Sequence, residues 1–159
     1  MAVTERSADL IFLLSQAAHS LQTEMTRDLA ALGVTPRMHC VLYHALGGEF
    51  TQIQLAEQCA LDKTTMVVTM DALEQAGLAA RRPSPTDRRA RIIAVTEQGA
   101  AVVKAADAIV TRLYGNVLES LPADARDVFV GSLQSLVDGR LATPPDCDQP
   151  VRRRRVSSS

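Results

Sequence analysis

The sequence contains no tryptophan, and aromatic residues make up 3% of its 159 residues. Aromatic platforms for stacking single-stranded nucleic acid are therefore not expected. Its three cysteines are widely spaced and include no CxxC pair, which argues against a disulfide framework or a zinc knuckle and fits a reducing cytoplasm. No apolar run approaches the roughly 20 residues that a membrane span needs. The N-terminus also lacks the pattern of a signal peptide.

Net charge is also nearly absent, at −1, so the overall charge does not indicate a nucleic-acid partner. The distribution of charge is more informative than its sum. A short segment interrupted by two prolines gathers five arginines, and a second basic cluster lies near the C-terminus. Taken alone, such a charge run is usually a solvated surface turn. The arginines concerned are Arg81, Arg82, Arg88, Arg89 and Arg91, with Arg152 to Arg155 in the second cluster.

Apolar residues recur at spacings of three and four along most of the chain, which is typical of amphipathic helices. We predict a first helix over 7–32 that stops at Gly33, and a second helix that Thr35 caps and Pro36 opens. A long helix follows from 97 to about 120, and a last one begins at Pro122. The first predicted stripe is Leu10, Leu14, Ala17, Leu21, Met25, Leu29 and Leu32. The stripe of the long helix is Ala101, Ala105, Ile109, Leu113 and Val117, and that of the last helix includes Val128, Phe129, Leu133, Leu136 and Val137.

The segment TQIQLAEQCALDKTTMVVTMDALEQAG, residues 51–77, predicts two helices joined by a tight turn. Thr51 followed by Gln54 is a capping box that starts a short helix, in which Ile53 and Ala56 are expected to face inward. Asp62 then caps a second helix over 63–76. Its apolar residues share one face, so the opposite face is predicted to be exposed: Lys63, Thr64, Thr65 and Val68.

After Gly77 the spacing of the apolar residues no longer follows the helical period. LAARR and RIIAVT are short segments typical of strands, and they bracket PSPTD, a turn-rich loop in which Pro83 and Pro85 exclude helix. We predict an antiparallel hairpin with an arginine-bearing loop. Two helices followed by such a hairpin form a winged helix-turn-helix. This arrangement inserts a helix into the major groove of DNA and brings arginines to the minor groove.

Residues 55–99, LAEQCALDKTTMVVTMDALEQAGLAARRPSPTDRRARIIAVTEQG, resemble the MarR family of bacterial transcriptional regulators. The matching signature is Leu-Glu-x-x-Gly-Leu at 73–78, two arginines, the run Asp87-Arg88-Arg89, and an apolar strand that closes on Thr96 and Gly99. With the flanking helices, the resemblance covers about 7–141. It implies a mainly α fold with a small β-hairpin wing, acting as a homodimer on a pseudo-palindromic double-stranded DNA operator.

The resemblance also implies which residues contact DNA. Asp87 matches the acidic wing residue that braces an arginine, and Arg89 is our choice for insertion into the groove. Many relatives carry threonine or arginine where Val67 and Val68 stand, so Val68 is expected to touch a thymine methyl group. Independently of the resemblance, Thr35, Arg37 and Gln52 stand at helix starts and are expected to contact phosphates. Together, the predicted DNA-binding residues are Thr35, Arg37, Gln52, Lys63, Thr64, Thr65, Val68, Asp87, Arg88, Arg89 and Arg91.

Family members often respond to small aromatic acids or to oxidants, so a repressor released by a small anionic effector is expected. His19, Arg37 and His39 are the candidate effector ligands. Cys40 lies on a helix with an apolar pattern and Cys59 lies near a helix end, so both are expected to pack as small hydrophobes. Oxidant-sensing relatives place their reactive cysteine near the start of the first helix, where this sequence has none. Although His39, Cys40 and His44 lie close together on one predicted helix, we expect no metal site and no cofactor.

The expected organisation is a single MarR-like domain over 1–142, followed by a disordered basic tail over 143–159. Helices at 7–32 and 97–141 flank a DNA-binding lobe at 35–96. We expect these flanking helices to form the dimer interface, because they carry more apolar surface than a small lobe covers. The sequence contains no nucleophile motif, metal-binding motif or phosphate-binding motif of the kind that would indicate an enzyme. The alternative function is a helical protein-interaction module without specific DNA binding.

Overall fold

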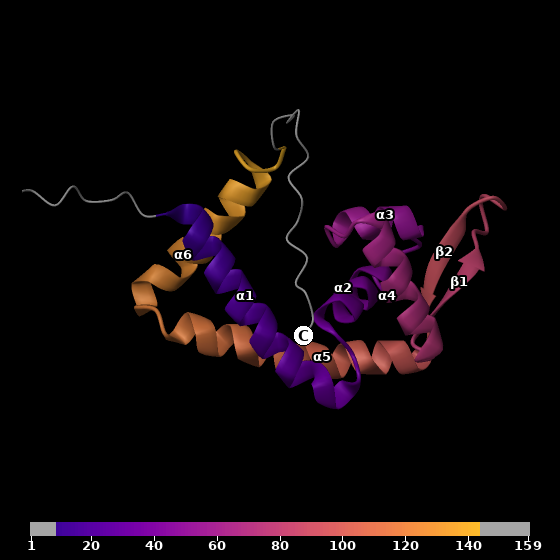
Figure 1. Cartoon of the computed structure of the whole chain (residues 1–159), viewed down its shortest axis with the longest axis horizontal. Coiled ribbons are helices and arrows are strands. Elements are labelled where there is room, and N and C mark those ends of the chain that lie inside the picture. Colours follow the sequence, from indigo (N-terminus) through magenta and orange to yellow (C-terminus); the bar gives the residue numbers. More distant parts are fainter. Residues whose placement is uncertain (1–8, 144–159) are drawn as a thin grey trace, which may run out of the picture. The chain divides into compact units, whose positions relative to one another are not determined.

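The computed structural model describes residues 9–143, whose contacts divide the chain into two compact units between Gly115 and Asn116. Figure 1 labels the helices and the two strands. The predicted tail lies outside the described residues apart from Thr143. No helix of the described range is long and apolar enough to cross a membrane. In chain order the elements are α1 (Leu10–Leu29), a 3₁₀ turn (Ala30–Leu32), α2 (Pro36–Ala45), α3 (Gln52–Gln58), α4 (Lys63–Gln75), β1 (Ala79–Pro83), β2 (Arg91–Val95), α5 (Glu97–Glu119) and α6 (Ala123–Asp138).

Helix α1 begins at Leu10, three residues later than predicted, because the side chain of Asp9 caps it by accepting from the backbone N–H of Phe12. It ends in the 3₁₀ turn rather than as α-helix, and Gly33 stops that turn with a φ of 69°. Met25 and Leu29 are buried near its C-terminal end. The first turns instead expose every large apolar side chain: Leu10, Ile11, Phe12, Leu13 and Leu14.

Helices α2, α3 and α4 pack on one another and build the core of the first unit. The predicted face of α4 is confirmed, since Met66, Met70 and Leu73 are all buried. In α3 the prediction is wrong for Ile53, which is 72% exposed. Because each helical residue turns about 100°, Ile53 lies opposite Leu55, and it is Leu55 with Ala56 that reaches the core.

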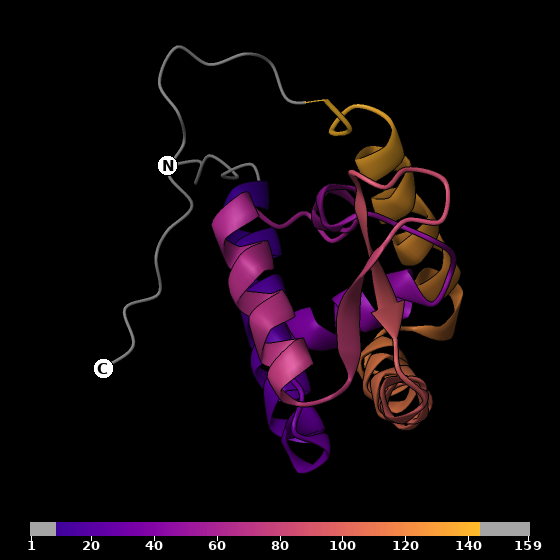
Figure 2. The ribbon, with the colours of Figure 1, turned by 90° about the vertical axis from the view of Figure 1, so that its right-hand side faces the viewer.

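Strands β1 and β2 form the predicted antiparallel hairpin, in a register that pairs Arg81 with Ile93 and Pro83 with Arg91. Strand β2 also bonds to the segment before α3, where Ile93 N–H donates to the carbonyl of Phe50. Strand β1 packs beside α4, as Figure 2 shows from the side of the hairpin. The hairpin is therefore fixed on two sides, against α3 and against α4.

Helix α5 starts where Thr96 accepts the backbone N–H of Gly99 and donates to the carbonyl of Gly77. A Cβ on Gly99 would lie 2.0 Å from the carbonyl oxygen of Leu78, so only glycine allows the helix to start this close to the strand. Within this chain the predicted stripe is not the buried face: Ala101, Ala105 and Val117 are exposed, and Leu113 is its buried member. Four-residue steps drift about 40° each around a helix. The buried residues alternate steps of four and three instead: Gly99, Val103, Ala106, Val110 and Leu113.

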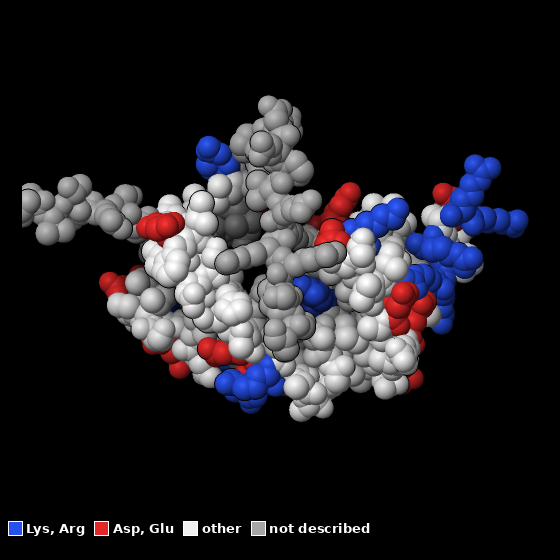
Figure 3. Space-filling view, viewed as in Figure 1, with Lys and Arg blue, Asp and Glu red and all other residues white. Residues whose placement is uncertain are grey.

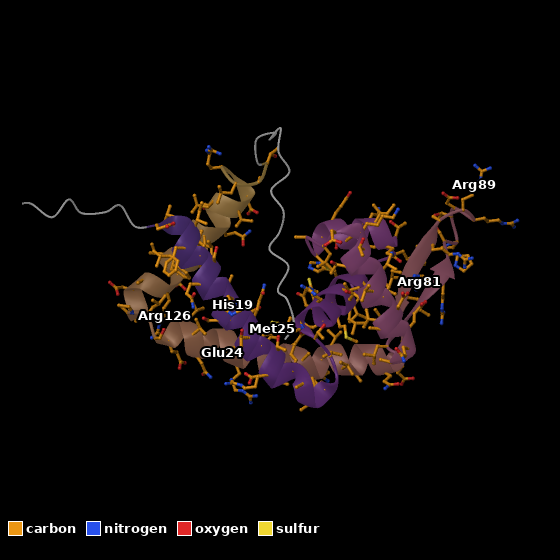
Figure 4. The ribbon with its side chains drawn as sticks, viewed as in Figure 1. His19, Glu24, Met25, Arg81, Arg89 and Arg126 are labelled. Atoms are coloured by element: carbon orange, nitrogen blue, oxygen red, sulfur yellow. The ribbon has the colours of Figure 1, made fainter. Side chains whose placement is uncertain are left out.

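The second unit contains the end of α5 and the whole of α6. Arg126 joins the two, because its guanidinium donates to the backbone carbonyls of Glu119 and Leu121, both at 3.2 Å (Figure 4). None of the α6 residues is buried in the described chain. Leu133 is half-buried. Five other large apolar side chains of α6 are between 44% and 67% exposed: Val128, Phe129, Val130, Leu136 and Val137.

Candidate nucleic-acid interface

The N-terminal turn of α4 presents polar side chains to solvent. Lys63 and Thr64 are exposed, and Val68, one turn on, is 64% exposed. The buried methionines and Leu73 hold the opposite face of the helix against the core, so this face cannot turn inward. The residues that the sequence predicted for base contact are therefore available on one helical surface.

Asp62 caps α4 by accepting from the backbone N–H of Thr65 at 2.9 Å and from its hydroxyl at 2.7 Å. These two bonds hold the pKa of the Asp62 carboxyl below its usual value. The hydroxyl of Thr65 is thus committed as a donor to the cap. It remains able to accept a hydrogen bond, which limits how it could contact a base or a phosphate.

Two other helix starts carry predicted phosphate contacts. Thr35 caps α2 by accepting from the backbone N–H of Met38 at 3.2 Å, and Arg37 is exposed in the first turn of that helix. Thr51 and Gln54 form the predicted capping box at the start of α3. Gln52, in the first turn of α3, has its side-chain oxygen occupied by an arginine of the hairpin.

The loop of the hairpin is ordered by a network around Ser84, which is buried. Its hydroxyl accepts from the backbone N–H groups of Thr86 and Asp87, both at 3.3 Å. Asp87 in turn accepts from the backbone N–H of Arg89 at 2.9 Å. The predicted brace by Asp87 therefore acts on the main chain of Arg89, and no ion pair of Asp87 occurs within residues 9–143.

This network leaves the arginine side chains of the loop in solvent. Arg88, Arg89 and Arg91 are exposed, and Arg89 points away from the rest of the hairpin in Figure 4. Figure 3 shows lysine and arginine side chains gathered over the hairpin. Because a guanidinium at the end of a rigid loop is preorganised, it loses less entropy when it enters a narrow groove of negative potential.

Arg81 has a role that sequence reasoning missed. Its guanidinium donates to Asp71 at 2.9 Å, to Glu74, and to Gln52 at 3.0 Å, while its backbone N–H donates to Glu74. This one side chain connects β1 to both α4 and α3. The available signal was the pair Asp71 and Glu74, one turn apart on a helix that precedes an arginine-bearing strand. In the sequence, Arg81 was only one of the five arginines of the basic cluster.

The three predicted effector ligands lie on two helices of the first unit. His19 is exposed on α1 and Arg37 is exposed on α2. His39 is buried, and its Nε2 lies 3.0 Å from a carboxylate oxygen of Asp107 on α5. This bond gives His39 a partner within the chain and joins α2 to α5. An effector role for the three residues remains a prediction.

Cys40 on α2 and Cys59, the C-cap of α3, both have half-buried free thiols. A hydrogen bond from Cys59 lowers the pKa of Cys40 to about 7, and the same bond raises the pKa of Cys59. Cys59 also packs against the core, as a small hydrophobe would. The two thiols therefore form a contacting pair, which their sequence separation gave no reason to expect.

A model of the MarR family matches residues 32–90. A MarR-family transcriptional regulator from Rhodococcus sp. RHA1 is 30% identical and superposes with a TM-score of 0.74, over 84% of this chain and 95% of that chain. The chain belongs to the MarR family. It has the mainly helical fold with a two-stranded hairpin that the sequence predicted for this family of DNA-binding transcriptional regulators.

Two further MarR-like matches are structures of the repressor CouR. CouR from Rhodococcus jostii RHA1 bound to p-coumaroyl-CoA is 29% identical, with a TM-score of 0.73, over 89% of this chain and 96% of that chain. CouR bound to a 23-mer DNA duplex is 28% identical, with a TM-score of 0.76, over 86% of this chain and 98% of that chain. These matches extend over nearly the whole length of each relative.

Proposed function

We propose that this MarR-family chain is a transcriptional repressor that binds a pseudo-palindromic DNA operator as a homodimer. The observation that carries the proposal is the exposed polar start of α4 beside a hairpin whose loop presents Arg88 and Arg89 to solvent. Support also comes from CouR, a repressor of similar fold whose structure contains a DNA duplex. Helix α4 would enter the major groove, and the hairpin would reach the adjacent minor groove.

The contacts divide by chemistry. Lys63, Arg37, the cap residue Thr35 and Gln52 in the first turn of α3 would contact phosphates, since exposed helix starts offer backbone N–H groups and a favourable dipole. Thr64, Thr65 and Val68 would face base edges in the major groove. Arg88, Arg89 and Arg91 would approach the duplex from the hairpin, with Asp87 fixing the main chain that carries Arg89.

The test uses duplexes selected from a random pool by the full-length chain. Arg89→Ala should weaken binding to the selected duplex by roughly 10-fold or more, in line with the ~1–3 kcal/mol that a groove-reading arginine contributes. The dependence of affinity on salt should also become shallower. The melting temperature should stay nearly unchanged, because the side chain of Arg89 is exposed.

Arg27→Ala is the matched control, since Arg27 is an exposed arginine of α1 outside the helix-turn-helix and the hairpin. It should leave affinity for the selected duplex nearly unchanged. If the wild-type chain shows no preference over random DNA at any salt concentration, the repressor proposal is wrong. The helical protein-interaction module would then be the remaining function.

We further propose that a small aromatic or acyl ligand releases the repressor from DNA. The support is CouR, whose structure holds p-coumaroyl-CoA. His19, Arg37 and His39 are the proposed ligand contacts. A ligand that prefers the folded chain should raise its melting temperature in proportion to its saturation. p-Coumaroyl-CoA should therefore stabilise the free protein and weaken its binding to the selected duplex, and His19→Ala should reduce both effects. Stabilisation without loss of DNA affinity would contradict the release mechanism.

A further inference from the structure

Three side chains with soft donor atoms come together between α2 and α3. Cys40 and His44 are four residues apart on α2 and so lie on the same helical face. Cys59 reaches them from the C-terminal end of α3. The ligand atoms of Cys40, His44 and Cys59 all lie within 4.8 Å of one another, and each residue is half-buried.

The dimensions of this cluster suit a four-coordinate ion. Zinc binds thiolate sulfur at about 2.3 Å and imidazole nitrogen at about 2.0–2.1 Å, so tetrahedral ligand atoms lie about 3.5–3.8 Å apart. The ligand atoms of the cluster lie up to 4.8 Å apart, about an ångström more than this, and side-chain rotation can close the difference. Two thiolates and one imidazole favour zinc over magnesium or calcium, which prefer oxygen ligands.

The other histidine of α2 does not belong to this donor set. His39, which the sequence places close to Cys40 and His44, is bonded to Asp107 and is therefore committed elsewhere. Half-burial of Cys40, His44 and Cys59 leaves one side of the cluster open to solvent. A water molecule or an external ligand could then complete the tetrahedron, as in zinc sites with three protein ligands.

We propose that Cys40, His44 and Cys59 bind one zinc ion, which ties α2 to the end of α3. This proposal departs from the expectation, drawn from the sequence, that the chain has no metal site. It would also fix the turn into α4, because Cys59 directly precedes Ala60, which has a φ of 51°, and Asp62 caps α4 two residues after that. The metal would thereby stiffen the joint between the two helices of the helix-turn-helix.

The first experiment titrates the full-length, reduced chain with Co²⁺ and then with Zn²⁺ in the absence of oxygen. One equivalent of Co²⁺ per chain should bind, with the intense thiolate-to-cobalt absorption and the visible bands of a tetrahedral site, and Zn²⁺ should displace it. Cys40→Ser, His44→Ala and Cys59→Ser should each weaken binding by more than about 100-fold, because even the loss of an outer partner costs 10- to 100-fold.

Cys147→Ser and His19→Ala are the matched controls, because each removes a residue of the same type that is not one of the three proposed ligands. Both should bind Co²⁺ like the wild-type chain. Absence of stoichiometric binding, or loss of binding in Cys147→Ser with retention in Cys40→Ser, would overturn the proposal.

A second measurement does not depend on variants that fold. Zinc should protect two of the three thiols of the wild-type chain from alkylation, and mass spectrometry of peptides should identify them as Cys40 and Cys59. Zinc should also raise the melting temperature of the wild-type chain, since binding to the folded state stabilises it. Equal alkylation of all three thiols with and without zinc would contradict the site.

Discussion

The guanidinium of Arg81 has three side-chain partners on two helices, and its position decides how the hairpin is attached. The side chain is 25% exposed, so its bonds to Glu74 and Gln52 are largely shielded from solvent. Its bond to Asp71, which is 64% exposed, contributes less, because solvent screens it. A lysine could not replace it, since a single ammonium lacks the planar fork of donors that meets separate partners.

Arg81→Ala is therefore expected to lower the free energy of unfolding by about 1.5–3 kcal/mol, the range for hydrogen bonds to charged groups. Chemical denaturation of the purified chain measures this. Arg82→Ala, which removes an exposed arginine from the next position of the same strand, should change stability by less than about 0.5 kcal/mol. Equal effects of the two substitutions would show that the contacts of Arg81 do not stabilise the hairpin.

Helix α4 depends at its first turn on one carboxylate. Because the pKa of Asp62 is lower in the folded chain than in the unfolded chain, its stabilising contribution is complete above the unfolded pKa, near 4. The contribution is lost as the pH falls through the folded pKa, when the carboxyl becomes protonated and accepts hydrogen bonds less well. The start of the proposed recognition helix is thus sensitive to acid.

Asp62→Asn tests this link, because asparagine caps helices about as well as aspartate but does not titrate. Urea unfolding midpoints of wild type and variant should be compared between pH 7 and about pH 3. The stability of the wild-type chain relative to the variant should decrease as the pH falls, with most of the change below about pH 5. Parallel pH profiles for the two proteins would rule out the contribution of Asp62.

On the scale of the whole molecule, the described chain leaves two apolar helical surfaces in solvent. The first turns of α1 expose Phe12 with its neighbours, and α6 exposes Phe129 with its neighbours. A groove on α6 is lined partly by apolar side chains, among them Val128 and Leu136. Surfaces of this kind usually bind a partner. Burial by a second copy of the chain is the homodimer that we propose.

Phe129→Asp is accordingly expected to shift the chain from dimer to monomer, because it would place a charge in an apolar interface. Sedimentation velocity at several protein concentrations measures the association. Gln134→Glu adds one negative charge at a polar position of the same helix and should leave the dimer intact. A Phe129→Asp chain that remains fully dimeric would exclude α6 from the interface. Leu21 is less suitable for this test, because it packs against the core of its own chain.

Much of the candidate interface could be predicted from local sequence. Thr35, Thr51 and Asp62 could be identified as caps because a side-chain oxygen at the start of a helix can accept the backbone N–H three residues later. The structure confirms all three caps. The hairpin followed from the change of period after Gly77 and from the prolines. The predicted DNA and effector contacts of individual residues remain predictions, since they concern molecules outside the chain.

The amino-acid sequence by itself determined what depends on neighbours within a few residues: the helices, their caps, the hairpin and its arginines. Only the tertiary structure decided which distant side chains meet. It placed the guanidinium of Arg81 within hydrogen-bond distance of Asp71, Glu74 and Gln52, and it brought Cys59 next to Cys40 and His44. The reason is physical. Apolar spacing shows that a helix has a buried face, but the angle at which two such faces pack decides which polar side chains at their edges come within reach.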